Sequence, residues 1–355
     1  MNQIYSLLTR LLFRFLPFIW LMSCITPIDF DVANKGGQLV ISGQVSSLPD
    51  RNEIQIGITA DSQLPVPVTG ATVQLLDDLG NEAFYFENKE GVYILSGFQG
   101  IPGRIYHIVI TLPNGVTYES IPEKMPEFAA PVDVSTEFIE EVYTDAEGAN
   151  LLRRFVKLYA STSLPTEWKM PYVNWTVEEV YKLSPTDFPD PFGIIPPPCF
   201  IAQKADPNRI SLFDGSQVRS KEVENVLVCS RIVDRSFLEK HYFNTYQSSL
   251  TPEAHAYWNK VNILANQTGS IFDTPPAQIT GNVFNVNNSN QKVWGYFQAT
   301  HETQNRLFLL PTDFPFLVFF PLDDCTYDPY RFEYPQYCYD CSLIRNSTYN
   351  RPDWF

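Results

Sequence analysis

The chain has 355 residues, enough for two or three compact domains, and a formal net charge of −15. This acidic balance argues against a nucleic-acid-binding protein, because neutralising phosphates requires a basic face. It also argues against electrostatic docking to anionic lipid. Short runs rich in Val, Ile, Tyr, Phe and Thr alternate with Pro, Gly, Asn and Asp, which is typical of a mainly β protein.

The first residues have the order of a bacterial lipoprotein signal. Two arginines precede the apolar run Phe15–Met22, which is too short to cross a bilayer comfortably, and the small residue Ser23 precedes Cys24. We predict a signal peptide over residues 1–23 and a lipid on Cys24; the alternative is an ordinary secretory signal with an incidental cysteine. Processing would remove both arginines and change the net charge to −17, so membrane attachment would depend on the lipid.

The N-terminal part of the mature chain reads as a tether followed by a sandwich. Residues 24–37 have little periodicity and close on a glycine pair, which favours a linker. Residues 38–122 contain seven short segments with strand character: 38–46, 53–60, 72–76, 82–87, 91–95, 103–110 and 116–120. Their number and spacing are typical of an immunoglobulin-like or transthyretin-like β-sandwich.

The remaining residues, 123–355, predict a larger β-rich domain with one or two helices. Strands are expected at 132–144, 153–162, 172–183, 225–233, 240–250, 292–300 and 306–311. The clearest helix begins after Thr251, because proline suits the first turn and the acid that follows complements the helix dipole. Its apolar stripe includes Tyr257 and Trp258, which we expect to pack on a sheet; a binding surface is the alternative.

Five cysteines follow Cys24, and in an exported protein they favour disulfides. We predict that Cys199, Cys325, Cys338 and Cys341 form two bridges in the C-terminal region. The odd count leaves a thiol over, and Cys229, in an apolar strand, is expected to be unpaired and buried. A metal site or a redox dithiol at Cys338-x-x-Cys341 is the alternative, although further metal ligands and a following helix are not evident.

Other chemistry has weaker support. Asp323, Asp324 and Asp328 could bind Ca²⁺ together with backbone carbonyls, but their spacing is not that of an EF-hand, and Asp-rich turns are commonly just solvated. No other metal or cofactor is expected. The chain lacks a Gly-x-Ser-x-Gly elbow, a His-Glu-x-x-His motif and a P-loop. We predict a non-enzymatic protein, with a surface hydrolase as an alternative, because paired carboxylates are recognisable only in space.

Several segments together resemble a known family. They are, in order, Leu21-Met22-Ser23-Cys24, Val68-Thr69-Gly70-Ala71-Thr72-Val73, GSIFDTPPAQITGNVFN (269–285), KVWGYF (292–297) and the closing Cys-x-x-Cys and Arg-Pro-Asp-Trp-Phe. This order is similar to that of a family of outer-membrane lipoproteins from Bacteroidota, known as domain of unknown function 4249. The resemblance covers essentially the whole mature chain and supplies no catalytic residues.

The resemblance implies a location and a partner. Genes of that family often lie beside genes for TonB-dependent outer-membrane transporters, so the resemblance implies a lipid-anchored protein at the outer membrane with such a transporter as its partner. We expect it to face the cell exterior; a periplasm-facing lipoprotein is the alternative. Surface-exported lipoproteins of that phylum usually carry acids close behind the lipidated cysteine, whereas here the first acids are Asp29 and Asp31.

We therefore expect a binding or accessory subunit of a TonB-dependent transporter system. The loops Ser184–Pro198 and Pro321–Tyr337, rich in Pro, Asp and aromatic residues, are the expected ligand contacts. A structural subunit of an outer-membrane assembly or export complex is the alternative.

Overall fold

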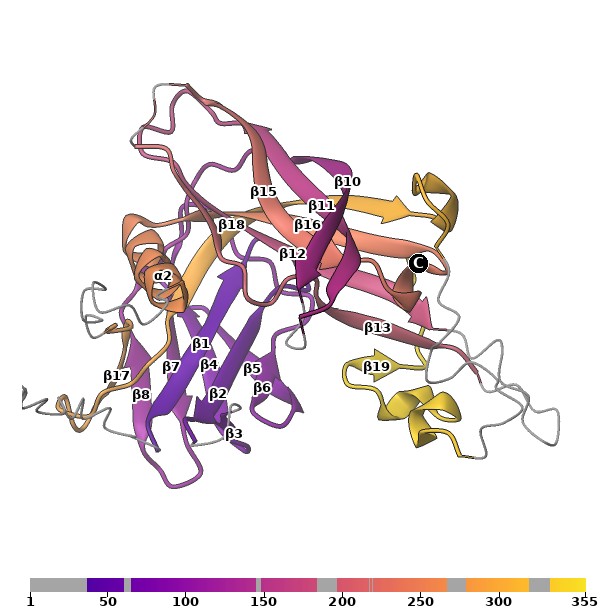
Figure 1. Cartoon of the computed structure of the whole chain (residues 1–355). Coiled ribbons are helices and arrows are strands. Elements are labelled where there is room, and N and C mark those ends of the chain that lie inside the picture. Colours follow the sequence, from indigo (N-terminus) through magenta and orange to yellow (C-terminus); the bar gives the residue numbers. More distant parts are fainter. Residues whose placement is uncertain are drawn as a thin grey trace, which may run out of the picture. The chain divides into compact units, whose positions relative to one another are not determined.

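The computed structural model describes residues 37–60, 65–144, 148–183, 197–216, 218, 220–266, 279–318 and 333–355. All of them belong to one compact unit, Gly37–Phe355. This unit is mainly β, as predicted, and its described residues contain one α-helix (Figure 1). The predicted signal peptide and Cys24 lie outside the described residues. In the part of the chain that is described, no helix is long and apolar enough to cross a membrane.

The N-terminal strands form the predicted sandwich. They are β1 (Leu39–Ser46), β2 (Glu53–Ile58), β3 (Val66–Pro67), β4 (Thr72–Asp77), β5 (Glu82–Lys89), β6 (Val92–Ile94), β7 (Ile105–Thr111), β8 (Thr117–Ser120) and β9 (Glu123–Lys124). β5 pairs with both β4 and β6, so it connects the two halves of the sandwich. Alternate residues such as Ile54 and Ile108 are fully buried in one core between them.

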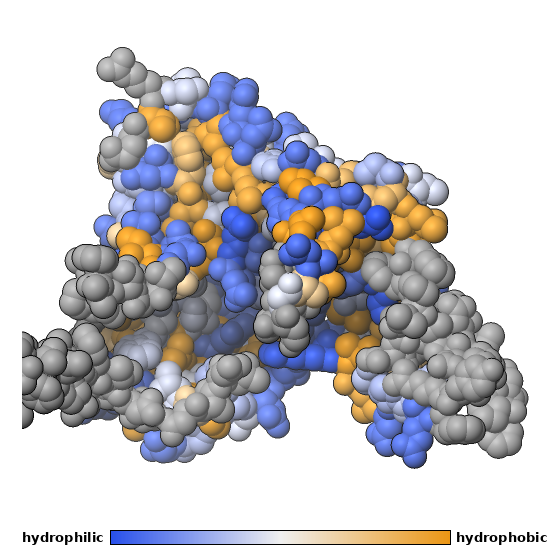
Figure 2. Space-filling model, viewed as in Figure 1, coloured by the Kyte–Doolittle hydropathy of each residue, from blue (hydrophilic) through white to orange (hydrophobic). Residues whose placement is uncertain are grey.

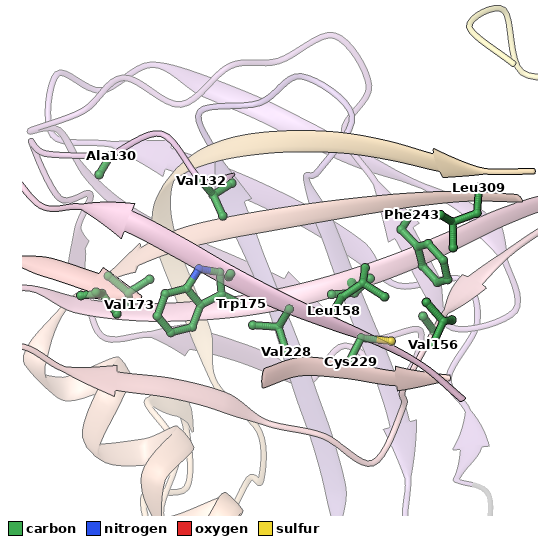
Figure 3. Packing of buried hydrophobic residues seen from close by; sticks show 14 of the residues in the cluster. Ala130, Val132, Val156, Leu158, Val173, Trp175, Val228, Cys229, Phe243 and Leu309 are labelled. Atoms are coloured by element: carbon green, nitrogen blue, oxygen red, sulfur yellow. The ribbon is translucent and has the colours of Figure 1, made fainter. Parts of the chain in front are cut away.

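The C-terminal strands form a second pair of layers. The larger sheet contains β12 (Tyr172–Leu183), β13 (Cys199–Lys204), β14 (Ser211–Asp214), β16 (His241–Leu250), β18 (Phe297–Leu309) and β19 (Ser347–Thr348). A three-stranded sheet contains β10 (Asp133–Thr144), β11 (Asn150–Ser163) and β15 (Glu222–Ile232). Figure 3 shows the apolar core that includes Leu158, Trp175 and Phe243, contributed by strands of both sheets.

One pair of predicted strands is a single strand. The separate strands expected at 292–300 and 306–311 were wrong, because β18 runs without interruption through the polar segment between them. That segment stays extended because β16 pairs with it from His241↔Leu309 to Ser249↔His301.

Strands distant in sequence complete the sandwich. β17 (Val283–Asn285) pairs with β8, and β18 runs parallel to β1. The chain approaches β1 very closely at Gly295, where φ is +96° and an added Cβ would lie 2.0 Å from the carbonyl oxygen of Ile41. An added Cβ at Gly281 would lie 1.7 Å from the oxygen of Gly295, so both positions require glycine.

Glu302 of β18 is buried where strand β1 of the sandwich meets the larger sheet. Its Oε1 accepts a hydrogen bond from Ser248 Oγ (2.6 Å) and its Oε2 accepts one from Ser46 Oγ (2.5 Å). Arg51 Nε lies 3.4 Å from the same Oε2, and its guanidinium also pairs with Glu178 and stacks on Tyr246. Burial alone would lower the pKa of Arg51, but the charges of Glu302 and Glu178 outweigh it and raise the pKa.

Removing this carboxylate should destabilise the junction. Glu302→Ala leaves two buried hydroxyls without their acceptor and Arg51 with only the partly exposed Glu178 as its charged partner. We therefore expect the free energy of unfolding to fall by about 3–5 kcal/mol. Urea unfolding at neutral pH measures the loss. The control is Glu178→Ala, which removes the partly exposed partner of Arg51 and should cost no more than about 1 kcal/mol. Equal small losses in both variants would contradict a supporting role for Glu302.

The cysteines staple the C-terminal segment. Cys199 in β13 is bonded to Cys341, 142 residues later, at the start of the 3₁₀ helix η5 (Cys341–Leu343). Cys338, in the 3₁₀ helix η4 (Gln336–Cys338), is also disulfide-bonded, so the Cys-x-x-Cys pair is not joined internally. Cys229 is free and buried, as predicted, and burial raises the pKa of its thiol to about 12.

Breaking the Cys199–Cys341 bridge should loosen this segment. A bridge over a long loop typically contributes about 2–4 kcal/mol, mainly by restricting the unfolded chain. We expect the double variant Cys199→Ala/Cys341→Ala to lose that much in urea unfolding without reductant. Limited proteolysis should then cut residues 333–355 before the rest of the chain. If unfolding and proteolysis were unchanged, the bridge would have no stabilising role.

Candidate functional site

An open groove of about 650 Å³ lies beside the start of helix α2 (Pro252–Ala265). Its walls come from three separate parts of the chain: residues 121–128, which include β9, then Trp168 and Met170, and finally residues 250–253. β9 belongs to the sandwich, and Leu250 is the last residue of β16 in the larger sheet. The groove therefore lies where the sandwich meets the larger sheet. Concave sites lined by apolar side chains and a few polar groups are the usual form of ligand-binding sites.

The start of α2 forms one wall of the groove. Thr251 is the N-cap, and its hydroxyl accepts a hydrogen bond from the backbone N–H of Ala254 (3.1 Å). The same hydroxyl donates to Glu123 Oε2 at 2.9 Å. Helix capping and the position of the carboxylate therefore depend on one side chain.

The predicted packing of the α2 stripe is confirmed. Tyr257 packs against Tyr296 with ring centroids 4.9 Å apart, and both belong to a small apolar cluster with Leu250. Trp258 Nε1 donates to Gln298 Oε1 at 2.7 Å. These contacts hold α2 against Gln298 of β18 and against Tyr296, the residue just before that strand. The start of α2, which lines the groove, is therefore held in place.

Glu123 is the central polar group of the site. It is 5% exposed, and its carboxylate accepts hydrogen bonds from the Tyr296 hydroxyl, from Thr251 and, at 3.5 Å, from Asn282 Nδ2. Burial raises the pKa of Glu123, and the donors from Tyr296 and Thr251 offset only part of that rise. Both oxygens are occupied, so Glu123 acts as a fixed acceptor that joins β9 to α2.

The rim of the groove is mixed in character. Met170 and Ile121 are exposed apolar side chains, and Phe128 stacks on Trp168 with centroids 6.4 Å apart. The exposed side chains of Lys124 and Glu127, also at the groove, form an ion pair of 2.6 Å. Such a rim can hold a ligand or peptide that combines apolar groups with a few polar ones.

A second polar cluster lies inside the core. Glu179 Oε2 accepts a hydrogen bond from Arg231 Nε (2.7 Å) and lies 3.2 Å from His241 Nε2, without good hydrogen-bond alignment. Burial raises the pKa of Glu179, but His241 and Arg231 outweigh it and lower the pKa. The imidazole is fully buried and stacks on Phe237 at 4.0 Å, so no substrate can reach it. This cluster connects β12, β15 and β16.

The structure brings together few of the residues predicted from sequence. Cys199 and Cys341 meet in a bridge. Cys325 and the acidic residues Asp323, Asp324 and Asp328 lie outside the described residues, as do most of both predicted contact loops. Among the residues that are described, no group of three or more His, Cys, Asp or Glu side chains is arranged to hold a metal ion.

Sequence reasoning missed the groove. Glu123 stands in a proline-rich stretch that reads only as a connection, and its partners Asn282 and Tyr296 lie 159 and 173 residues away. A glutamate flanked by prolines carries no periodic signal. Only the helix cap at Thr251 could be expected from local sequence.

A family described as Domain of unknown function (DUF4249) matches residues 25–306 of this chain. The chain belongs to this family. The match includes Glu123, Thr251 and Tyr296, so the groove is built within the DUF4249 region, whereas Cys341 of the disulfide lies beyond it. No curated protein matches the chain.

The raised pKa of Glu123 gives this DUF4249 protein a specific pH dependence. A carboxyl whose pKa is higher in the folded state binds more protons there, so its contribution to stability falls as pH rises through its ordinary value of 4.5 and above. Glu123→Gln removes this titration. We expect the variant to become more stable relative to the wild type between pH 4 and pH 7, as measured by urea unfolding at several pH values.

Glu127 is the matched control. Its hydrogen bond from Lys124 lowers the pKa, so the wild type should gain stability relative to Glu127→Gln as pH rises. The two differences should therefore have opposite signs. The same sign for both variants would contradict the assigned environments.

Proposed function

We propose that this protein is a non-enzymatic lipoprotein anchored at the outer membrane through Cys24, facing the cell exterior. It serves as a binding or accessory subunit of a TonB-dependent transporter system. The lipid positions the protein, a short tether carries the β-rich body, and that body captures a ligand or docks on the transporter.

The observation that carries this proposal is the state of Glu123 in the groove. A general acid or base needs a free oxygen to exchange a proton with its substrate. The carboxylate of Glu123 instead accepts hydrogen bonds from three donors in three separate parts of the chain, while exposed apolar side chains lie on the rim. This chemistry favours recognition over reaction.

The sequence supports the location. The arginines, the apolar run and Ser23-Cys24 have the order that lipoprotein processing requires. Membership of the DUF4249 family agrees with the resemblance from which the outer-membrane location and the transporter partner were inferred. An acidic chain has no electrostatic attraction to an anionic membrane, which makes a lipid anchor the simplest attachment.

The test is purification of the lipidated protein from native membranes in mild detergent, followed by identification of partners. We expect a TonB-dependent β-barrel protein to co-purify. A Cys24→Ala variant should lack the mass of the lipid, leave the outer-membrane fraction and lose that partner.

Other results would assign other functions. Recovery of several surface proteins without a β-barrel transporter would favour the structural subunit of an assembly or export complex. Retention of Cys24→Ala in the outer membrane with its partner unchanged would overturn the role of the lipid. Hydrolysis of a surface polymer by the purified protein would favour the hydrolase.

A further inference from the structure

The sheets of this protein end on edges of very different kinds. β17 and β19, at the two ends of the longest strand path, have 3 and 2 residues. β15, one edge of the three-stranded sheet, has irregular pairing with β11 at two places and a positive φ at Asn225. Short or irregular edges of this kind resist the addition of another strand.

β10, the opposite edge of the three-stranded sheet, has none of these protections. It has 12 residues, and its pairing with β11 runs from Asp133↔Ser161 to Thr144↔Asn150 without a bulge (Figure 1). Its sequence, DVSTEFIEEVYT, contains no proline, glycine or lysine. A long, regular edge without such residues is a template for pairing with another chain.

The outer side of β10 is open within the described structure. Side chains of β18 bind the chain just before the strand: Thr303 Oγ1 donates to the oxygen of Ala130 (2.6 Å) and Asn305 Nδ2 to that of Val132 (3.1 Å). From Asp133 onward, the backbone hydrogen bonds that β10 makes with described residues go to β11 alone.

The end of the β10–β11 hairpin extends beyond its sheet. The pairing of β11 with β15 stops at Phe155↔Ile232, followed by one further backbone bond from the Val233 N–H to the Arg154 oxygen. Within the described strands, residues 141–144 and 150–153 therefore have ladder partners only in each other. Val142 and Leu152 lie directly opposite in this ribbon and are 67% and 55% exposed. Figure 2 shows hydrophobic residues reaching the surface among hydrophilic ones on the face it displays.

The charges of β10 indicate what can pair with it. The strand has four acids and no base. On the β11 side these acids meet basic or hydroxyl groups: Arg154 pairs with Glu140 (2.7 Å), Lys157 with Glu141 (2.8 Å), and the Tyr159 hydroxyl with Glu137 (2.8 Å). A strand on the open side would face the same acids, so basic residues suit it. A second copy of β10 would oppose acids with acids.

We propose that β10 is a docking edge that takes an extended segment of a partner protein, with lysine or arginine alternating with apolar residues, as an added β-strand. The partner's backbone would supply the ladder of hydrogen bonds, and its basic side chains would select the acidic edge. This inference deepens the proposed function and rests on it for the existence of a partner.

The probe is an acetylated decapeptide in which lysine alternates with valine and threonine, added to the whole mature protein. We expect hydrogen exchange to slow at alternate amides of residues 133–144, because only every second N–H faces outward. A peptide with glutamate in place of lysine, and one with proline at alternate positions, should not slow exchange. Exchange that is unaffected by the lysine peptide, or slowed equally by all three peptides, would overturn the proposal.

A pair of neighbouring prolines separates binding from folding. The N–H groups of Ser135 and Thr136 point to opposite sides of β10, so proline at one position removes a bond to β11 and at the other removes only an outward donor. The two variants are Ser135→Pro and Thr136→Pro. We expect the one that loses only the outward donor to unfold like the wild type and to bind the lysine peptide about tenfold more weakly. Unchanged binding by both variants would contradict strand addition.

Two further outcomes are distinguishable. Slowed exchange at β10 that grows with protein concentration and needs no peptide would assign the edge to a second copy and overturn the proposal. If a β-barrel co-purifies from membranes but the outward-facing proline variant retains it, the proposed function stands and the docking edge fails. If the peptide binds β10 but no barrel co-purifies, the edge stands and the transporter role fails.

Discussion

The parallel pairing of β1 with β18 is the constraint on which the rest of the structure depends. β1 is the first strand of the sandwich, and β18 lies inside the larger sheet. Their pairing joins the sandwich and the larger sheet into one continuous path of hydrogen-bonded strands. It requires a backbone approach at Gly295 that no side chain could tolerate. It also buries Glu302, whose charge is paired with Arg51 and whose oxygens accept hydrogen bonds from Ser46 and Ser248, one on each side of the junction.

The residues just before β17 and β18 also build the groove. Asn282 precedes β17 and Tyr296 precedes β18, and both side chains donate hydrogen bonds to Glu123. β16 leads directly into Thr251, the N-cap of α2, which donates to the same carboxylate. The carboxylate of Glu123, in the short strand β9, is thus held by donors from distant parts of the chain. The groove and the docking edge are separate features: one depends on α2 and β9, the other on the β10–β11 hairpin.

Much of the fold could be predicted from local sequence. Strand positions in the sandwich, the α2 cap and the buried thiol at Cys229 each depend on patterns within a few residues. The failure at β18 has a physical reason. His301–Asn305 is polar and resembles a turn, but Glu302 is buried at a junction where polar partners are available, so hydropathy misrepresents its environment.

The sequence by itself determined the mainly β class, the order of the strands along the chain and the start of the helix, because periodicity and capping act over short distances. Only the tertiary structure decided that β18 joins β1, that Cys199 meets Cys341, and that Glu123 is buried beneath Tyr296. It alone left β10 at an edge. Strand partners and edges depend on contacts between distant segments, and no local pattern records which strand remains without a neighbour.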